Sequence, residues 1–67
     1  MNKKLLRLRT VEDYTGLSRS SIYRMIKAGE FPAPIQLTGS RSVAWLAEEI
    51  DTWIKSRISE SRGGDAK

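Results

Sequence analysis

The stretch TGLSRSSIYRMIKAGEFP, residues 15–32, predicts a helix with a defined start and a defined end. Ser18 stands where an N-cap is needed, and its hydroxyl can accept a hydrogen bond from an amide in the first turn. Gly29 is suited to end the helix, and Pro32 cannot continue it. The pattern therefore predicts a capped helix over about residues 19–28.

The two faces of this helix differ in chemistry. At 100° per residue, Ile22, Met25 and Ile26 fall within an apolar arc about 100° wide, which is typical of a face turned to a core. The opposite face carries Arg19, Ser20, Tyr23, Arg24 and Lys27. Arginine can contact guanine through two hydrogen bonds, whereas lysine and tyrosine more often hold phosphates. We interpret this face as a candidate DNA-recognition surface, with an ordinary solvated helix face as the alternative.

A shorter helix is predicted just before it. Thr10 is a good N-cap, and Asp13 three residues later approximates a capping box. Val11 and Tyr14 are spaced so that both would point inward, and Gly16 can adopt the left-handed conformation that ends a helix. Helix, short turn and capped helix are the layout of a helix-turn-helix. In that layout the amide of Ser18 can also contact a phosphate.

A β-hairpin is predicted after the second helix. Phe31 is expected to fold back onto the core, and apolar residues at Ile35 and Leu37, then at Val43 and Trp45, mark two short strands. The turn between the strands contains Gly39, Ser40 and Arg41. An arginine on such a turn can enter a narrow minor groove or hold a phosphate, and an ordinary polar turn is the alternative.

A third helix is predicted from about Ala47. Its buried stripe is expected to contain Leu46, Ile50, Trp53, Ile54 and Ile58. Acidic residues occupy its first turns, where the helix dipole favours anions, and Lys55 and Arg57 are expected near its end. The spacing assigns Trp45 and Trp53 to the core rather than to a stacking platform for single-stranded nucleic acid.

The two ends of the chain have different characters. The opening MNKKLLRLR alternates apolar and basic residues, so a short strand or an extended arm is expected there. Its cations can contact phosphates or can serve solubility: Lys3, Lys4, Arg7 and Arg9. The closing SESRGGDAK has no apolar residue larger than alanine. We therefore expect one domain over residues 1–58 and a disordered tail over residues 59–67.

Composition narrows the functional classes. The 67 residues include no cysteine and no histidine, which excludes disulfides, thiolate and imidazole chemistry and the usual zinc sites. We expect no enzyme activity, no cofactor and no metal. The net charge is +4, and residues 1–45 hold a surplus of cations while residues 46–58 are slightly acidic, which favours a polyanionic partner. No signal peptide or membrane span is predicted, so a cytoplasmic location is expected.

Three sequence blocks carry a resemblance to a known family. They are TGLSRSSIYRMI, then G-E-F-P-x-P-I-x-L, then W-L-x-x-E-I-D-x-W-I, within residues 6–58. The chain resembles the AlpA family of small phage and prophage regulators, within the wider MerR-like and excisionase-like group. The resemblance implies a mostly α fold with a small β-hairpin, a winged helix-turn-helix. Such sequences often have serine where this chain has Glu48, so the third helix lacks an obvious side-chain cap.

The resemblance also implies a function. It predicts a sequence-specific regulator of double-stranded DNA, with the second helix in the major groove and the hairpin wing on flanking DNA. One alternative is an excisionase that bends attachment-site DNA for an integrase. An alternative of another class is a small protein-binding adaptor that does not read DNA. One such module reads few base pairs, so self-association on repeated sites is also expected.

Overall fold

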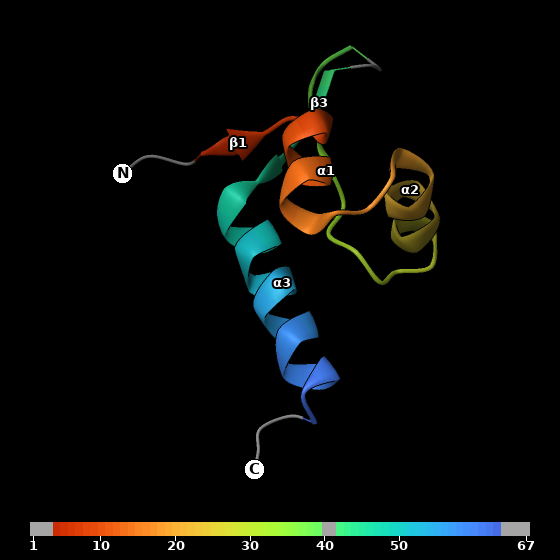
Figure 1. Cartoon of the computed structure of the whole chain (residues 1–67). Coiled ribbons are helices and arrows are strands. Elements are labelled where there is room, and N and C mark those ends of the chain that lie inside the picture. Colours follow the sequence, from red (N-terminus) through yellow and green to blue (C-terminus); the bar gives the residue numbers. More distant parts are fainter. Residues whose placement is uncertain (1–3, 40–41, 64–67) are drawn as a thin grey trace.

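The computed structural model describes residues 4–39 and 42–63. Figure 1 shows the helices grouped against one small sheet, with the last helix extending below it. The elements in chain order are β1 (Leu5–Leu6), α1 (Leu8–Thr15), α2 (Arg19–Lys27), β2 (Ile35–Thr38), β3 (Ser42–Leu46) and α3 (Ala47–Ser61). This order confirms a mostly helical chain with a β-hairpin, as expected for a winged helix-turn-helix.

The sheet has three antiparallel strands in the order β1-β3-β2. β1 joins the predicted hairpin through the pairing of Leu6 with Trp45, so the predicted N-terminal strand is confirmed, although it is short. The alternating pattern suggested that the strand would reach Arg9, which is wrong because α1 already begins at Leu8. Leu5 and Leu6 therefore extend the wing sheet.

The start of α1 differs from the sequence-based expectation. Thr10 is not the N-cap, because the helix begins at Leu8 after Arg7, and no side chain caps it. Leu6 is buried in the sheet, and the chain turns into the helix at once, which brings Leu8 onto the core. Tyr14 was expected to point inward, yet 58% of its surface is exposed. At 100° per residue Leu8 and Tyr14 lie about 60° to either side of the fully buried Val11, and the core packs on the Leu8 side.

The core forms where the three helices meet the sheet. Its fully buried large side chains are Val11, Ile22, Trp45 and Ile50. Burial of each such side chain stabilises the fold by about 1.5–3 kcal/mol. The predicted inward residues of α2 are confirmed, because Ile22 is fully buried and its apolar neighbours on the helix pack against the same cluster. Phe31 is also buried, as expected.

The end of α3 also differs from expectation. Residues 59–61 were assigned to a disordered tail, but they continue the helix, in which Arg57 and Glu60 form an ion pair of 3.1 Å. Lys55 and Arg57 therefore do not lie in the last turn. Ile58 was expected to be buried, yet 46% of its surface is exposed. Figure 1 gives the reason. The distal half of α3 extends past α1 and α2, so these helices cover it only in part. Residues 64–67 lie outside the described residues.

The start of α3 is held by the backbone of β1. Its N-cap residue, Leu46, makes no side-chain cap, which agrees with the missing serine at Glu48. The N–H of Ala47 instead donates to the carbonyl oxygen of Lys4 at 2.8 Å. The residue just before β1 thus accepts from one of the N–H groups that have no partner within α3. No helix in residues 4–39 and 42–63 has the length and apolar character that a membrane crossing requires.

Candidate nucleic-acid interface

The turn before α2 fixes where that helix begins. Gly16 adopts the left-handed conformation with φ 74°, which ends α1 as predicted. The Ser18 hydroxyl oxygen accepts the N–H of Ser21 at 3.2 Å and donates to the Ser21 hydroxyl oxygen at 3.1 Å. Both serines therefore have structural roles at the helix start, and the predicted N-cap is confirmed. The remaining free amides of this turn point out from the N-terminus of α2, where anions are favoured.

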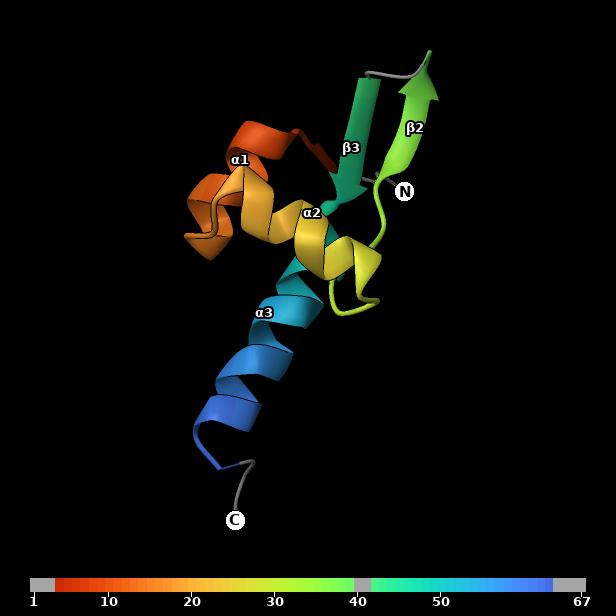
Figure 2. The same ribbon diagram turned by 90° about the vertical axis from the view of Figure 1, so that its right-hand side faces the viewer.

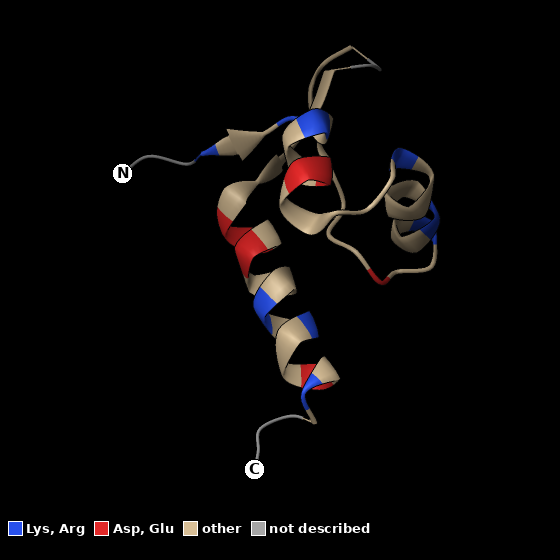
Figure 3. Ribbon diagram, in the orientation of Figure 1, with Lys and Arg blue, Asp and Glu red and all other residues tan. Residues whose placement is uncertain are grey.

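The exposed face of α2 carries positive charge only. Arg19, Arg24 and Lys27 are all exposed, and none of them forms an ion pair with another residue in the described part of the chain. Ser20 is exposed among them. Figure 3 shows the Lys and Arg positions of α2 on the side turned away from α3. The structure thus brings the predicted recognition residues of this helix together on one accessible surface.

Tyr23 has a contact that the sequence reading did not anticipate. Its ring meets the ring of Trp45 edge-to-face, with centroids 6.5 Å apart and an interplanar angle of 64°. Its exposed fraction is 38%, so it belongs partly to the surface and partly to the junction of α2 with β3. On the helical projection Arg19 lies between Tyr23 and Ile26, the end of the apolar arc, so the local pattern did not single out Tyr23. Tyr23 therefore connects the helix with the wing.

Two indole groups fix the connection between α2 and the wing. The Trp45 Nε1–H donates to the carbonyl oxygen of Pro32 at 2.9 Å, and the Trp53 Nε1–H donates to that of Glu30 at 2.8 Å. Phe31 between them packs edge-to-face on Trp53 at 4.7 Å. Trp45 is fully buried and Trp53 is half-buried, which confirms their assignment to the core. The orientation of α2 relative to the hairpin is therefore set by specific contacts.

The remaining predicted contact residues lie in two other places. Gly39 is exposed at the end of β2 with φ 60°, while Ser40 and Arg41 lie outside the described residues, as does Lys3. Three further cations of the proposed arm are exposed: Lys4, Arg7 and Arg9. Figures 1 and 2 place β1 on the opposite side of the molecule from α2. The structure thus does not bring Lys4 together with the cations of α2.

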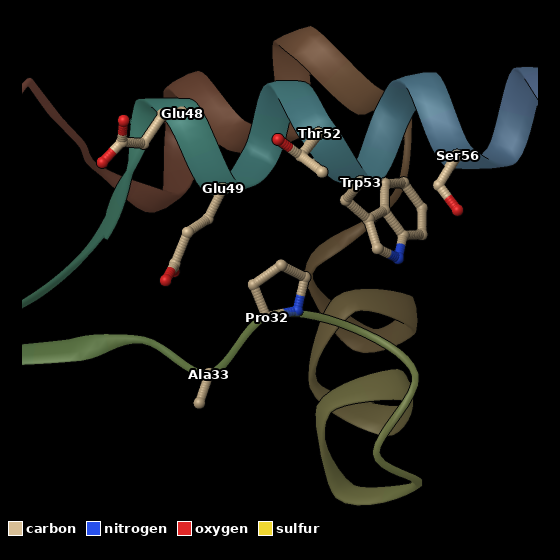
Figure 4. Close-up of a pocket in the computed structure, with 7 residues that line it drawn as sticks. All are labelled: Pro32, Ala33, Glu48, Glu49, Thr52, Trp53 and Ser56. Carbon is tan, nitrogen blue, oxygen red and sulfur yellow. The ribbon is translucent and has the colours of Figure 1, made fainter.

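The acidic residues of α3 mark a different surface. A groove between this helix and the α2–β2 connection is lined by Pro32, Ala33, Glu48, Glu49, Thr52, Trp53 and Ser56. Figure 4 shows Glu49 pointing toward the connection across this groove, with Pro32 and Trp53 at its apolar end. A polyanion would be repelled here and attracted to α2. The charges of the molecule therefore favour α2 as the nucleic-acid side.

Comparison with known proteins decides the family. The model of the family described as prophage CP4-57 regulatory protein (AlpA) matches residues 4–58. The chain belongs to the AlpA family. The match includes every helix of the described fold except the last residues of α3. The resemblance inferred from the sequence blocks is thus confirmed.

Two relatives support the same assignment. Uncharacterized protein ORF88 of Enterobacteria phage P4 is 45% identical over 65 residues, which cover 96% of this chain and 73% of that protein. The DNA-binding transcriptional activator AlpA of Escherichia coli (strain K12) is 34% identical, over 81% of this chain and 84% of that protein. The AlpA family is a family of DNA-binding prophage regulators and not a family of enzymes.

Proposed function

We propose that this protein is a sequence-specific regulator of transcription that inserts α2 into the major groove of double-stranded DNA. The observation that carries the proposal is the exposed face of α2, where Arg19, Arg24 and Lys27 have no ion-pair partner among the described residues. In a member of the AlpA family, such charges are available to phosphates and base edges.

The shape of α2 suits the groove. Nine residues give a helix about 14 Å long, and the major groove of B-DNA is about 12 Å wide and accepts one helix. Ser20 and Arg24 lie opposite the apolar arc, so they are the side chains that reach deepest toward base edges. Arg24 is the residue we assign to guanine, through paired hydrogen bonds to O6 and N7. Lys27 and Arg19, at the ends of the helix, are assigned to phosphates.

Two other features support this position of the helix on the duplex. The free amides at the start of α2, next to Ser18, suit a phosphate at the edge of the groove. The wing, with Gly39, Ser40 and Arg41 at its turn, is assigned to the flanking backbone or minor groove. The contact of Tyr23 with Trp45 keeps the helix and the wing at one angle, so both can bind the same duplex together.

The test is selection of bound sequences from a random duplex DNA pool at roughly 150 mM salt, where non-specific binding is suppressed. We expect one enriched motif. The matched comparison is a triple variant, Arg19→Ala, Arg24→Ala and Lys27→Ala, against Lys55→Ala on α3. All four positions are exposed, and alanine favours the helix, so both proteins should fold.

The triple variant should recover no motif, while Lys55→Ala should recover the same motif as the unaltered protein. Retention of DNA without an enriched motif would contradict sequence-specific regulation and favour the architectural role of an excisionase. Absence of any retention would favour the protein-binding adaptor. Equal motifs from the triple variant and the control would show that α2 is not the reading element.

A further inference from the structure

An apolar groove lies between the end of α1, α2 and the distal half of α3. It has a volume of about 420 Å³, and its apolar lining includes Tyr14, Leu17, Met25, Ile54 and Ile58. Tyr14 and Ile58 at its rim are 58% and 46% exposed. These are the two positions at which an inward orientation was expected and is not observed. The groove is therefore an apolar surface that the described fold does not cover.

A second exposed apolar side chain lies on the wing. Leu37 in β2 is 40% exposed. The strand register passes from Gln36 opposite Val43 to Thr38 opposite Ser42, so Leu37 is the extra residue of a β-bulge. Its neighbours Gln36 and Thr38 are uncharged, so this edge brings no charge of its own to the groove, whose one charged lining residue, Arg57, pairs with Glu60.

The groove and the bulge lie toward opposite ends of the molecule. In Figure 2 α2 crosses the view at the front, the hairpin rises above it and α3 descends below it. A recognition helix lies along the major groove, and thus across the duplex axis. On the proposed function, which this inference requires, the hairpin and the distal part of α3 therefore point in opposite directions along the DNA.

The length of the molecule brings neighbours into contact. Its longest extent is 45 Å, whereas sites one helical turn apart are separated by about 34–36 Å. Figures 1 and 2 show that the molecule is longest from the hairpin to the far end of α3, so two copies on the same side of the duplex at this spacing meet end to end. The elements that meet are the hairpin of one copy and the α1–α3 groove of the next.

We propose that the groove is the docking site for a second copy of this chain, whose Leu37 inserts between Tyr14 and Ile58. The contact joins two different surfaces, so it is heterologous and repeats along the DNA instead of closing into a dimer. Few side chains take part, and an interface this small is weak in solution. Copies therefore associate when adjacent DNA sites hold them together, which raises their effective concentration.

The test uses the full chain and duplexes that carry the motif recovered by the selection above. One duplex has a single site, a second has two sites one helical turn apart, and a third has two sites half a turn further apart. We expect the second site to be filled about 5–150-fold more tightly than a single site at the first spacing. No such gain is expected when the sites face opposite sides of the duplex.

Two neutral substitutions locate the contact. Leu37→Gln and Ile58→Gln should each remove most of the gain. The affinity for the single-site duplex should be unchanged, because neither substitution alters the charge that attracts DNA, and Leu37 lies in β2, before the residues assigned to flanking DNA. Leu5→Gln is the matched control, because Leu5 is 42% exposed on β1, away from both surfaces. Thermal unfolding of each variant checks that the fold persists.

Mixing the two variants distinguishes a heterologous contact from a symmetric one. A Leu37→Gln copy keeps its groove and an Ile58→Gln copy keeps its bulge, so the mixture should recover cooperativity that neither variant has alone. Loss with Ile58→Gln but not with Leu37→Gln would overturn the proposal in favour of groove-to-groove pairing. Independent filling of both sites by the unaltered protein would overturn it as well. Weak single-site binding by the unaltered protein would instead refute the proposed function.

Discussion

α2 and α3 differ in how they use their charged residues. α3 has fifteen residues, and within it Lys55 pairs with Asp51 at 3.2 Å and Arg57 pairs with Glu60 at 3.1 Å. α2 has nine residues and no acidic residue, and its cations have no ion-pair partner in the described chain. One helix therefore neutralises its cations along its own surface, and the other leaves them available.

The ion pairs of α3 affect which cations are available to a binding partner more than they affect the stability of the fold. Exposed ion pairs contribute about 0–1 kcal/mol each, so the pairs on α3 add little to the fold. An isolated helix of nine residues is unstable in water, so α2 depends on its cap and on its buried face. The helix assigned to DNA is thus held by the core and by Ser18, while its charged side chains remain unengaged. The predictions below test this contrast.

The largest effect is expected from Ile22→Ala. Ile22 is the fully buried residue of α2, and loss of such a side chain costs about 2–5 kcal/mol. A domain of this size has a free energy of unfolding of about 3–10 kcal/mol, so most of the variant's stability should be lost. Urea unfolding followed by circular dichroism measures it. A midpoint equal to that of the unaltered protein would show that α2 is not anchored through Ile22.

Arg24→Ala should weaken specific DNA binding by about 1–3 kcal/mol and relax the base preference at one position. The reason is the loss of paired hydrogen bonds to one base edge. Titration of the selected duplex and of single-base variants measures both effects. Lys55→Ala is the control, because its cation already pairs with Asp51, and its affinity should match that of the unaltered protein.

An unchanged base preference in Arg24→Ala would show that another residue of the exposed face recognises that base. Equal losses in Arg24→Ala and Lys55→Ala would show that only overall charge matters, and would remove the contrast between the two helices.

Ser18→Ala should destabilise the fold by about 1 kcal/mol, because the N–H of Ser21 loses its acceptor. Chemical denaturation measures the change in the free energy of unfolding. Ser18→Asp is the matched variant, since aspartate is an equally good N-cap and should retain the stability. The same aspartate would place a negative charge beside the proposed phosphate site and should weaken DNA binding. Equal stability of the alanine variant would show that the cap is not needed.

The smallest effect is expected from Asp51→Asn on α3. It breaks the pair with Lys55, which is fully on the surface, and should change the free energy of unfolding by no more than about 0.5 kcal/mol. Affinity for DNA should be unchanged, because Asp51 lies on α3 and outside the surface assigned to DNA. A larger decrease in the free energy of unfolding than Ser18→Ala causes would show that the ion pair on α3 contributes more to stability than the N-cap of α2.

The sequence was sufficient for the features that depend on local chemistry. The cap at Ser18, the left-handed Gly16 and the apolar arc around Ile22 are confirmed, since each depends on residues within one or two turns. The hairpin is also confirmed, because turn residues separate its two apolar runs. The exposed cations of α2 follow from the same helical periodicity, although their contact with DNA stays a prediction.

The features that the sequence did not reveal depend on contacts between distant segments. α1 begins at Leu8 and not after Thr10, because β1 pairs with β3 and delivers the chain to the core early. Tyr23 meets Trp45 through the packing of α2 on the wing, which no local pattern encodes. Ile58 fits the apolar period of its helix, yet it is 46% exposed, because the ends of α1 and α2 leave open the groove that it lines.

The pairing of β1 with β3 also has a consequence for the order of folding during synthesis. Leu5 and Leu6 leave the ribosome well before their partners, Leu46 and Trp45, which belong to β3. α1 and α2 can form local contacts earlier, because domains acquire structure as their segments emerge. The sheet and the start of α3, which depends on the carbonyl of Lys4, are completed only when both ends of the domain are present. A truncated product released before β3 would thus carry α2, the helix proposed to bind DNA, without the wing that orients it.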